Sequence, residues 1–120
     1  MEVPVLKQGE VLIATFQAAL SDADLKSLRS NLIAQVVKLR SRGVIVDVTA
    51  MDVMDSFASR TLREIAQMIR LRGAETVIVG IQPDVAFAMV QLGLTLEGVV
   101  TALDLEEGLA YLTNKFKNIA

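Results

Sequence analysis

The chain has 120 residues, enough for one domain with its own core, and no linker or repeat divides it, so we take residues 1–120 as a single domain. Its 12 basic and 14 acidic residues give a formal net charge of -2, and only 4% of residues are aromatic, so a nucleic-acid surface is not expected. The absence of Cys and His excludes disulfides and the usual zinc ligands, which leaves carboxylate binding of Mg²⁺ as the metal chemistry still open.

The chain opens with a predicted β-hairpin. Two strand-sized runs rich in β-branched residues, Val3 to Leu6 and Val11 to Phe16, flank a short segment that contains Gly9. The first ten residues have no basic segment ahead of a long apolar stretch, so they do not resemble a signal peptide, and we expect a cytosolic protein.

An amphipathic helix is predicted next. Ser21 and Asp24 have the spacing of a capping box, and apolar residues recur every three or four positions from Leu25 to Leu39. Gly43, which tolerates a positive φ, is expected to end this helix. The continuous apolar run over residues 44–48 is typical of a strand that is covered on both faces.

The second half of the chain predicts two further helices around a second buried strand. One helix follows the segment DVMDSFASR, the strand covers residues 76–81, and Pro83 suits the first position of a short helix through Leu92. This short helix is apolar nearly all round, which favours burial, with an assembly contact as the alternative. Polar and glycine residues interrupt the apolar window over residues 85–103, so a membrane-spanning helix is not expected.

A last strand over residues 99–103 leads into a final helix, which Asp104 and Glu107 are expected to cap. The apolar positions of this helix are Leu105, Leu109, Leu112, Phe116 and Ile119. The complete order of elements is β, β, α, β, α, β, α, β, α. It predicts an α/β domain with a mixed β-sheet and helices packed against it.

The segment DVMDSFASR follows a strand, where functional residues of such sheets gather, and either Asp55 or Ser56 is the expected helix cap. Without a histidine base, the chain does not support a serine nucleophile, so we expect no catalytic residue. An Mg²⁺ site on Asp47, Asp52 and Asp55 would also need acids after the first strand, which are missing, so no metal is expected. What remains is a serine that is a substrate. A phosphate on Ser56 would be favoured by the helix start and by Arg60, and repelled by the two neighbouring acids.

The stretch from Gly43 to Thr49, followed by Met54-Asp55-Ser56, resembles the STAS domain family, which takes its name from sulfate transporters and anti-sigma-factor antagonists. In that family the Asp-Ser dipeptide at the start of the second helix carries a regulatory phosphoserine. Ile81-Gln82-Pro83 and the stretch from Thr101 to Leu109 resemble, more narrowly, the RsbS-type stressosome antagonists of the bacterial general stress response.

This resemblance implies a non-enzymatic scaffold without a cofactor. It would assemble with paralogous sensor proteins that end in STAS domains, and it would sequester a serine kinase until that kinase phosphorylates Ser56; a separate phosphatase would reset the serine. Ser59 and Thr49 are secondary phosphorylation candidates. The expected partner-binding residues are Asp55, Ser56, Phe57 and Arg60.

The hydrophobic fraction of 52% is high for a small soluble domain, and we therefore also expect a partner or self-association. Two alternatives stay open. One is a stand-alone anti-sigma-factor antagonist that binds an anti-sigma kinase in a simple complex. The other, which we regard as less favoured, is a carboxylate- and Mg²⁺-dependent phosphotransfer domain.

Overall fold

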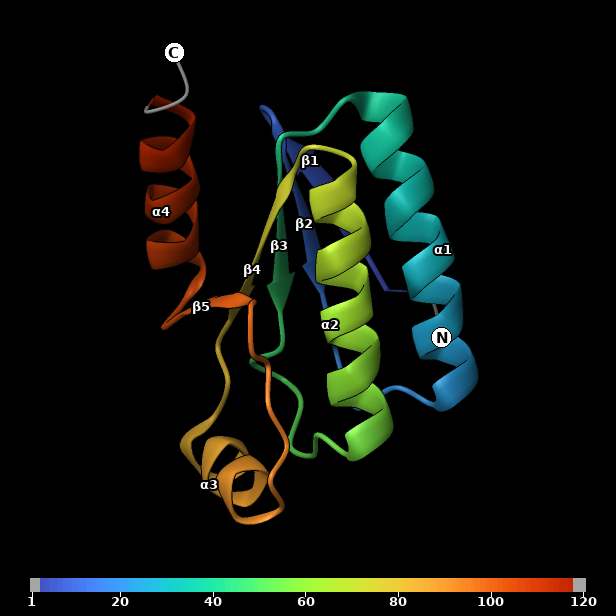
Figure 1. Cartoon of the computed structure of the whole chain (residues 1–120), viewed down its shortest axis with the longest axis vertical. Coiled ribbons are helices and arrows are strands. Elements are labelled where there is room, and N and C mark those ends of the chain that lie inside the picture. Colours follow the sequence, from blue (N-terminus) through green and yellow to red (C-terminus); the bar gives the residue numbers. More distant parts are fainter. Residues whose placement is uncertain (1–2, 118–120) are drawn as a thin grey trace.

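Five strands and four helices alternate along residues 3–117, the part of the chain that the computed structural model describes (Figure 1). The elements are β1 (Val5–Gln8), β2 (Val11–Thr15), α1 (Asp22–Leu39), β3 (Gly43–Asp47), α2 (Ser56–Leu71), β4 (Glu75–Val79), α3 (Pro83–Gln91), β5 (Val100–Ala102) and α4 (Leu105–Lys117). Their order and types confirm the prediction from the sequence. Ile119, predicted as part of the last helix, lies outside the described residues.

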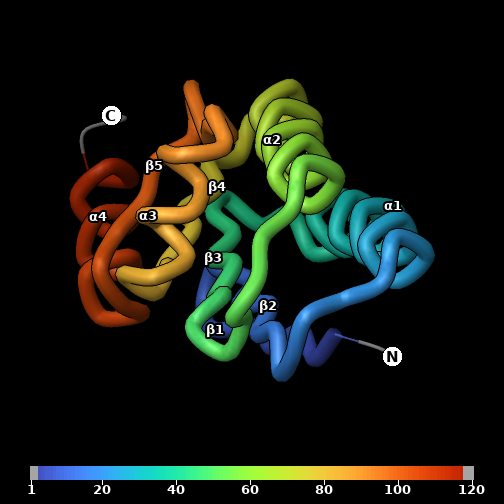
Figure 2. The backbone as a smooth tube through the Cα atoms, turned by 90° about the horizontal axis from the view of Figure 1, so that it is seen from below, coloured from blue at the N-terminus to red at the C-terminus, as the bar shows by residue number. Residues whose placement is uncertain are grey.

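The strands form one mixed sheet in the order β1-β2-β3-β4-β5. β1 is antiparallel to β2, and every later neighbour is parallel. From β2 to β4 the chain moves across the sheet in one direction. Right-handed crossovers therefore place α1 and α2 on the same face, while α4 covers the opposite face, as Figures 1 and 2 show.

The core lies in two layers, one on each face of the sheet. The layer under α1 and α2 is the larger, and the layer under α4 is smaller. Alternate side chains of the central strands supply both layers, as expected for strands that are buried on both faces. Those on the α1 and α2 side are Val44, Val46 and Ile78, and those on the α4 side are Ile45, Val77 and Val79.

The predicted capping box of α1 is confirmed, because Ser21 Oγ accepts a hydrogen bond from the Asp24 amide at 3.1 Å. The prediction that Gly43 ends this helix is wrong. Arg40 takes the left-handed conformation instead, with φ of 52°, and its amide donates to the Val36 carbonyl. Gly43 is the first residue of β3, where a Cβ atom would lie 2.9 Å from Leu112 Cδ1. A larger residue at this position would displace the Leu112 side chain, because α4 lies so close to the strand.

The preference for burial of the short helix α3 is also wrong. Only Val85 and Met89 are buried, whereas Phe87 and Val90 are 64% and 79% exposed. α3 lies beyond the carboxyl ends of the strands and not on a face of the sheet, so only one side of it reaches the core (Figures 1 and 2). Within residues 3–117, none of the helices has both the length and the apolar character that crossing a membrane requires.

Candidate functional site: the start of α2

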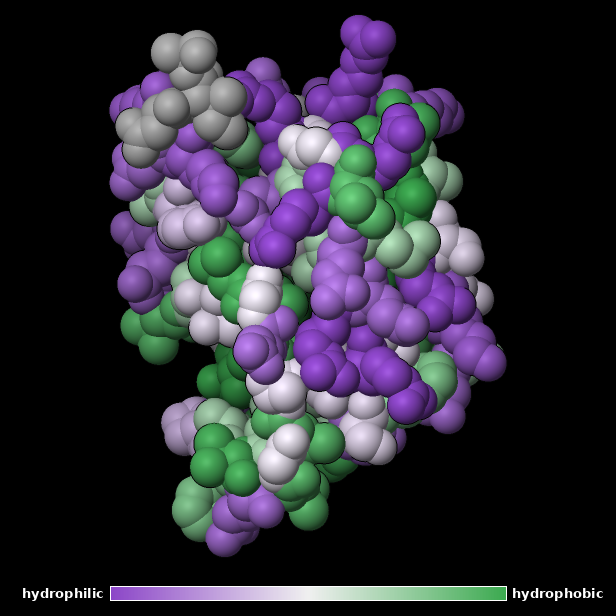
Figure 3. All heavy atoms as spheres, in the orientation of Figure 1, coloured by the Kyte–Doolittle hydropathy of each residue, from purple (hydrophilic) through white to green (hydrophobic). Residues whose placement is uncertain are grey.

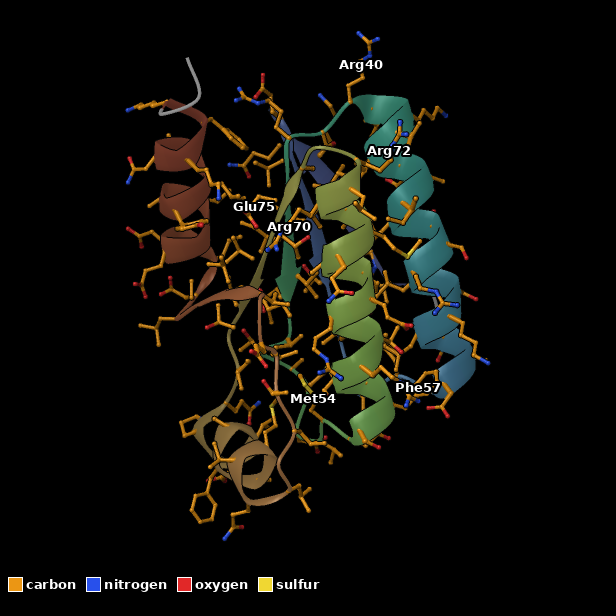
Figure 4. All side chains as sticks on the ribbon, in the orientation of Figure 1. Arg40, Met54, Phe57, Arg70, Arg72 and Glu75 are labelled. Atoms are coloured by element: carbon orange, nitrogen blue, oxygen red, sulfur yellow. The ribbon has the colours of Figure 1, made fainter. Side chains whose placement is uncertain are left out.

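The segment DVMDSFASR spans the end of the loop between β3 and α2 and the first residues of α2, and it lies at the same end of the molecule as α3 (Figure 1). Met51 and Met54 are both buried and belong to the core layer that also contains Val85 and Met89 of α3. Figure 4 shows Met54 at the lower end of α2, on the side toward α3. Because the loop is fixed at these two methionines, the polar residues around them are held toward solvent.

Asp55 caps α2, and Ser56 is the first residue of the helix. The Asp55 carboxylate accepts a hydrogen bond from the Ala58 amide at 2.8 Å, which satisfies one of the free amides of the first turn. Ser56 is exposed, and within residues 3–117 its hydroxyl has no hydrogen-bond partner. Of the two residues that the sequence left open as the helix cap, Asp55 is therefore the cap and Ser56 is not.

The two secondary candidates have different surroundings from Ser56. Ser59 is only 2% exposed, and its hydroxyl donates to the Ser56 carbonyl at 3.2 Å. A kinase could reach it only if the start of α2 opened. Thr49 is exposed, but its hydroxyl donates to Asp47 Oδ1 at 2.6 Å, and the same oxygen accepts the Thr49 amide at 3.0 Å. Phosphate on Thr49 would break this turn and lie against a carboxylate.

Phe57 is half-buried, and two cationic side chains lie near its ring. The Arg60 guanidinium is 5.7 Å from the centre of the ring, and Lys26 Nζ of α1 is 5.9 Å from it. Contacts of this kind are worth about 0.5–1 kcal/mol at exposed sites. Arg60 is thus held beside the first turn of α2, one helical turn from Ser56. Lys26 was not among the predicted site residues, because a contact between two helices leaves no mark in the spacing of either.

The predicted partner-binding residues therefore share one place in the fold. Asp55, Ser56, Phe57 and Arg60 all lie at the cap or in the first two turns of α2. The hydroxyl, the capping carboxylate, the aromatic ring and the guanidinium together form a mixed polar and aromatic surface. Such a surface is suited to recognising another protein.

A second, apolar surface lies at the same end of the molecule. We call it the α3 surface: Phe87 and Val90 of α3, with Leu92 directly after the helix, which is 70% exposed. Figure 3 shows hydrophobic atoms gathered over the lobe that α3 forms. An exposed apolar patch of this kind usually marks an interaction site.

The carboxylates considered for Mg²⁺ are engaged elsewhere or isolated. Asp47 accepts two hydrogen bonds from Thr49, Asp55 caps α2, and Asp52 is exposed. In the described part of the chain, no three acidic side chains come close enough together to hold a metal ion.

Sequence comparison gives a consistent set of relatives. The chain matches the STAS domain family over residues 2–108. It is 34% identical over 84 residues to the RsbT co-antagonist protein RsbRA of Bacillus subtilis (strain 168), covering 70% of this chain and 31% of that protein. The co-antagonist RsbRC of the same organism is 30% identical over 74 residues, covering 62% of this chain and 26% of that protein. The chain thus spans less than a third of the length of these curated relatives.

Solved structures give the same result over nearly the whole chain. A serine-to-glutamate variant of RsbS from Moorella thermoacetica has a TM-score of 0.83 and 31% identity, covering 98% of this chain and 99% of that one. A chain from a structure of the stressosome, described as a signal integration and transduction hub, has a TM-score of 0.75 and 31% identity, covering 95% and 99%. The anti-sigma factor antagonist SpoIIAA shares the fold, at a TM-score of 0.69 and 11% identity. The chain belongs to the STAS domain family, and its relatives include stressosome proteins.

Proposed function

We propose that the chain is a non-enzymatic, cytosolic scaffold of a stressosome-type assembly, which sequesters a serine kinase and releases it when Ser56 is phosphorylated. This release would control a general stress response. The observation that carries the proposal is the exposure of Ser56 at the first position of α2, where its hydroxyl is free to accept a phosphoryl group. Ser59, three residues on, is buried.

The unmodified serine presents a small neutral hydroxyl within the docking surface. The kinase transfers the terminal phosphoryl group of ATP to Ser56 Oγ, the hydroxyl loses its proton, and ADP leaves. The product carries roughly 1.5 to 2 negative charges, which the helix amino terminus and Arg60 attract more closely than the exposed carboxylates of Asp52 and Asp55 repel them. The fold is therefore retained, but the docking surface now presents a strongly hydrated anion. A kinase surface that fits a neutral hydroxyl must strip water from this anion, which weakens the complex.

The kinase is most directly sought among relatives of RsbT, because the curated relatives are named as RsbT co-antagonists. Those relatives also support a hetero-oligomer with paralogous STAS proteins. We assign the α3 surface to the contact with a neighbouring STAS domain, since it is apolar and the phosphorylatable surface at the same end of the molecule is polar. A separate phosphatase would restore the serine by hydrolysis.

The switch is tested by binding of an RsbT-type kinase to variants at Ser56. Ser56→Ala should keep binding, because the hydroxyl is removed without adding charge, and Ser56→Asp should bind at least ten-fold more weakly. Ser30→Asp is the matched control, since Ser30 is exposed on α1 and carries the same change away from the site. Equal binding of Ser56→Ala and Ser56→Asp would contradict the switch.

The position of the phosphate is tested by mass spectrometry after incubation with the kinase and ATP. Cleavage after Arg42 and Arg60 gives one peptide that contains Thr49, Ser56 and Ser59, and fragmentation distinguishes the three. We expect phosphate on Ser56. Phosphate on Thr49 or Ser59 alone, from a kinase shown to be active, would move the switch to that residue.

The alternative of a stand-alone anti-sigma-factor antagonist has support from the fold shared with SpoIIAA. Particle size separates the two functions. A stressosome component mixed with a paralogous STAS partner should enter very large particles in light scattering, whereas a stand-alone antagonist should form only a small complex with its anti-sigma kinase.

A further inference from the structure

We propose that a hollow near the amino ends of β3 and β4, at the end of the molecule opposite Ser56, binds the phosphate group of a small phosphorylated molecule. The hollow lies between the carboxyl ends of α1 and α2 and has a volume of about 310 Å³. It is lined by Val36, Val37, Arg40, Ser41, Arg42, Arg72 and Gly73.

The charge of the hollow is positive and largely unneutralised. Figure 4 shows Arg40 and Arg72 at the upper end of the molecule, where α1 and α2 end. Within residues 3–117, neither guanidinium has a hydrogen bond or an ion pair. Arg42 is already paired with Glu10 at 3.1 Å and lies 4.4 Å from the centre of the Phe116 ring. The two helix ends carry about half a negative charge each, so two free guanidinium groups leave a positive surplus.

Ser41 supplies a second and independent sign of a ligand. The residue lines the hollow and is only 7% exposed, yet its hydroxyl has no hydrogen-bond partner among the described residues. Buried hydroxyls are nearly always hydrogen-bonded, since an unpaired one has lost its bond to water. A phosphate oxygen in the hollow would accept a bond from this hydroxyl after rotation about the Cα–Cβ bond.

The backbone of Arg40 points in the same direction. With φ of 52°, this residue occupies the left-handed conformation that glycine adopts at helix ends without strain. The left-handed conformation favours glycine, whereas the negative end of the helix favours a cation. An arginine here keeps a positive charge beside the hollow at a cost in backbone energy.

The side chains identify the class of ligand. Guanidinium groups present parallel N–H donors that match the oxygens of a phosphate. The Ser41 hydroxyl would donate a further hydrogen bond to the phosphate from another side. Val36 and Val37 provide an apolar wall, on which a non-polar part of the ligand can pack. The hollow is therefore suited to a phosphomonoester with an apolar group, and inorganic phosphate should bind more weakly.

The test is an NMR titration of the ¹⁵N-labelled full chain with inorganic phosphate and with phenyl phosphate, at an ionic strength held constant with sodium chloride. We expect saturable shifts of the Arg40, Ser41 and Gly73 amides, and a lower dissociation constant for phenyl phosphate. Arg40→Gly and Arg72→Gln should each weaken binding about ten-fold, while Arg63→Gln, in the middle of α2, should not.

Loss of the fold cannot mimic this result, because Arg40→Gly relieves the backbone and should raise Tm while it weakens binding. Shifts no larger than those produced by chloride, or equal binding by wild type and Arg40→Gly, would overturn the proposal. Binding of phenyl phosphate no tighter than phosphate would also overturn it, since the apolar wall would then contribute nothing.

Discussion

Ser56 and Ser59 are three residues apart on α2, and their surroundings decide which of them can be modified. The first lies at the outer edge of the helix start, and the second turns inward and bonds to the backbone. The sequence shows two hydroxyls near a helix start but not which one faces solvent. If α2 began one residue earlier or later, both side chains would point in different directions. The cap at Asp55 fixes that starting point.

Asp55→Ala should lower the free energy of unfolding by about 1 kcal/mol, because the Ala58 amide loses its acceptor. Urea unfolding monitored by circular dichroism measures the change. Asp52→Ala is the matched control, since Asp52 is exposed in the same loop, and its effect should stay within about 0.5 kcal/mol. An equal loss for both variants would mean that the cap contributes nothing beyond loop charge.

The elements themselves could largely be predicted from the sequence, because their apolar residues repeat with clear periods and their ends carry recognisable caps. Two features could not. The left-handed residue after α1 is Arg40 and not Gly43, and Gly43 instead lies where α4, which is distant in the chain, comes close to the strand. The place of α3 also depends on tertiary packing, because an apolar helix looks the same in sequence whether it is buried or left exposed for a partner.

The contact between α4 and the sheet depends on a second glycine, Gly108. A Cβ atom there would lie 2.8 Å from Val79 Cγ1 and 3.4 Å from Ile45 Cδ1. Gly108→Ala should therefore destabilise the protein by about 1–3 kcal/mol through overpacking, although alanine is the better helix former. Thr113→Ala, on the exposed side of α4, should be neutral or slightly stabilising in the same urea experiment. A gain of stability in Gly108→Ala would mean that α4 can shift at no cost.

Lys115 connects α4 to β4 through Glu75. The hydrogen bond and the charge of the Glu75 carboxylate raise the pKa of Lys115 above its ordinary value of 10.5. Because the folded pKa is the higher one, this pair stabilises the protein fully below about pH 10.5 and loses its effect as the pH rises through the raised pKa. A ¹³C NMR titration of Lys115 should show a lower pKa in Glu75→Gln than in wild type; equal values would mean that the pair does not form in solution.

At the scale of the whole molecule, the described exposed apolar residues of α3 lie at the same end as Ser56. Val90→Lys should leave Tm unchanged, because Val90 is 79% exposed, and should block entry into large particles with a paralogous STAS partner. Leu71→Lys is the matched control, since Leu71 is 87% exposed at the opposite end of α2. Light scattering measures both mixtures. Assembly by Val90→Lys as complete as that of wild type would place the contact elsewhere.

The order of the strands has a consequence for what can reach the phosphorylatable end of the domain. Strands β2 to β5 follow one another across the sheet without a reversal. In doubly wound α/β enzymes, such a reversal parts two loops and opens the crevice that admits a cofactor. The order of the strands in this sheet therefore creates no such crevice. Two parts of the chain, the loop that follows β3 and the helix α3, extend over the carboxyl ends of the strands (Figure 2). An inhibitor of kinase docking at this end would have to compete across a broad protein surface, as a peptide or small protein does.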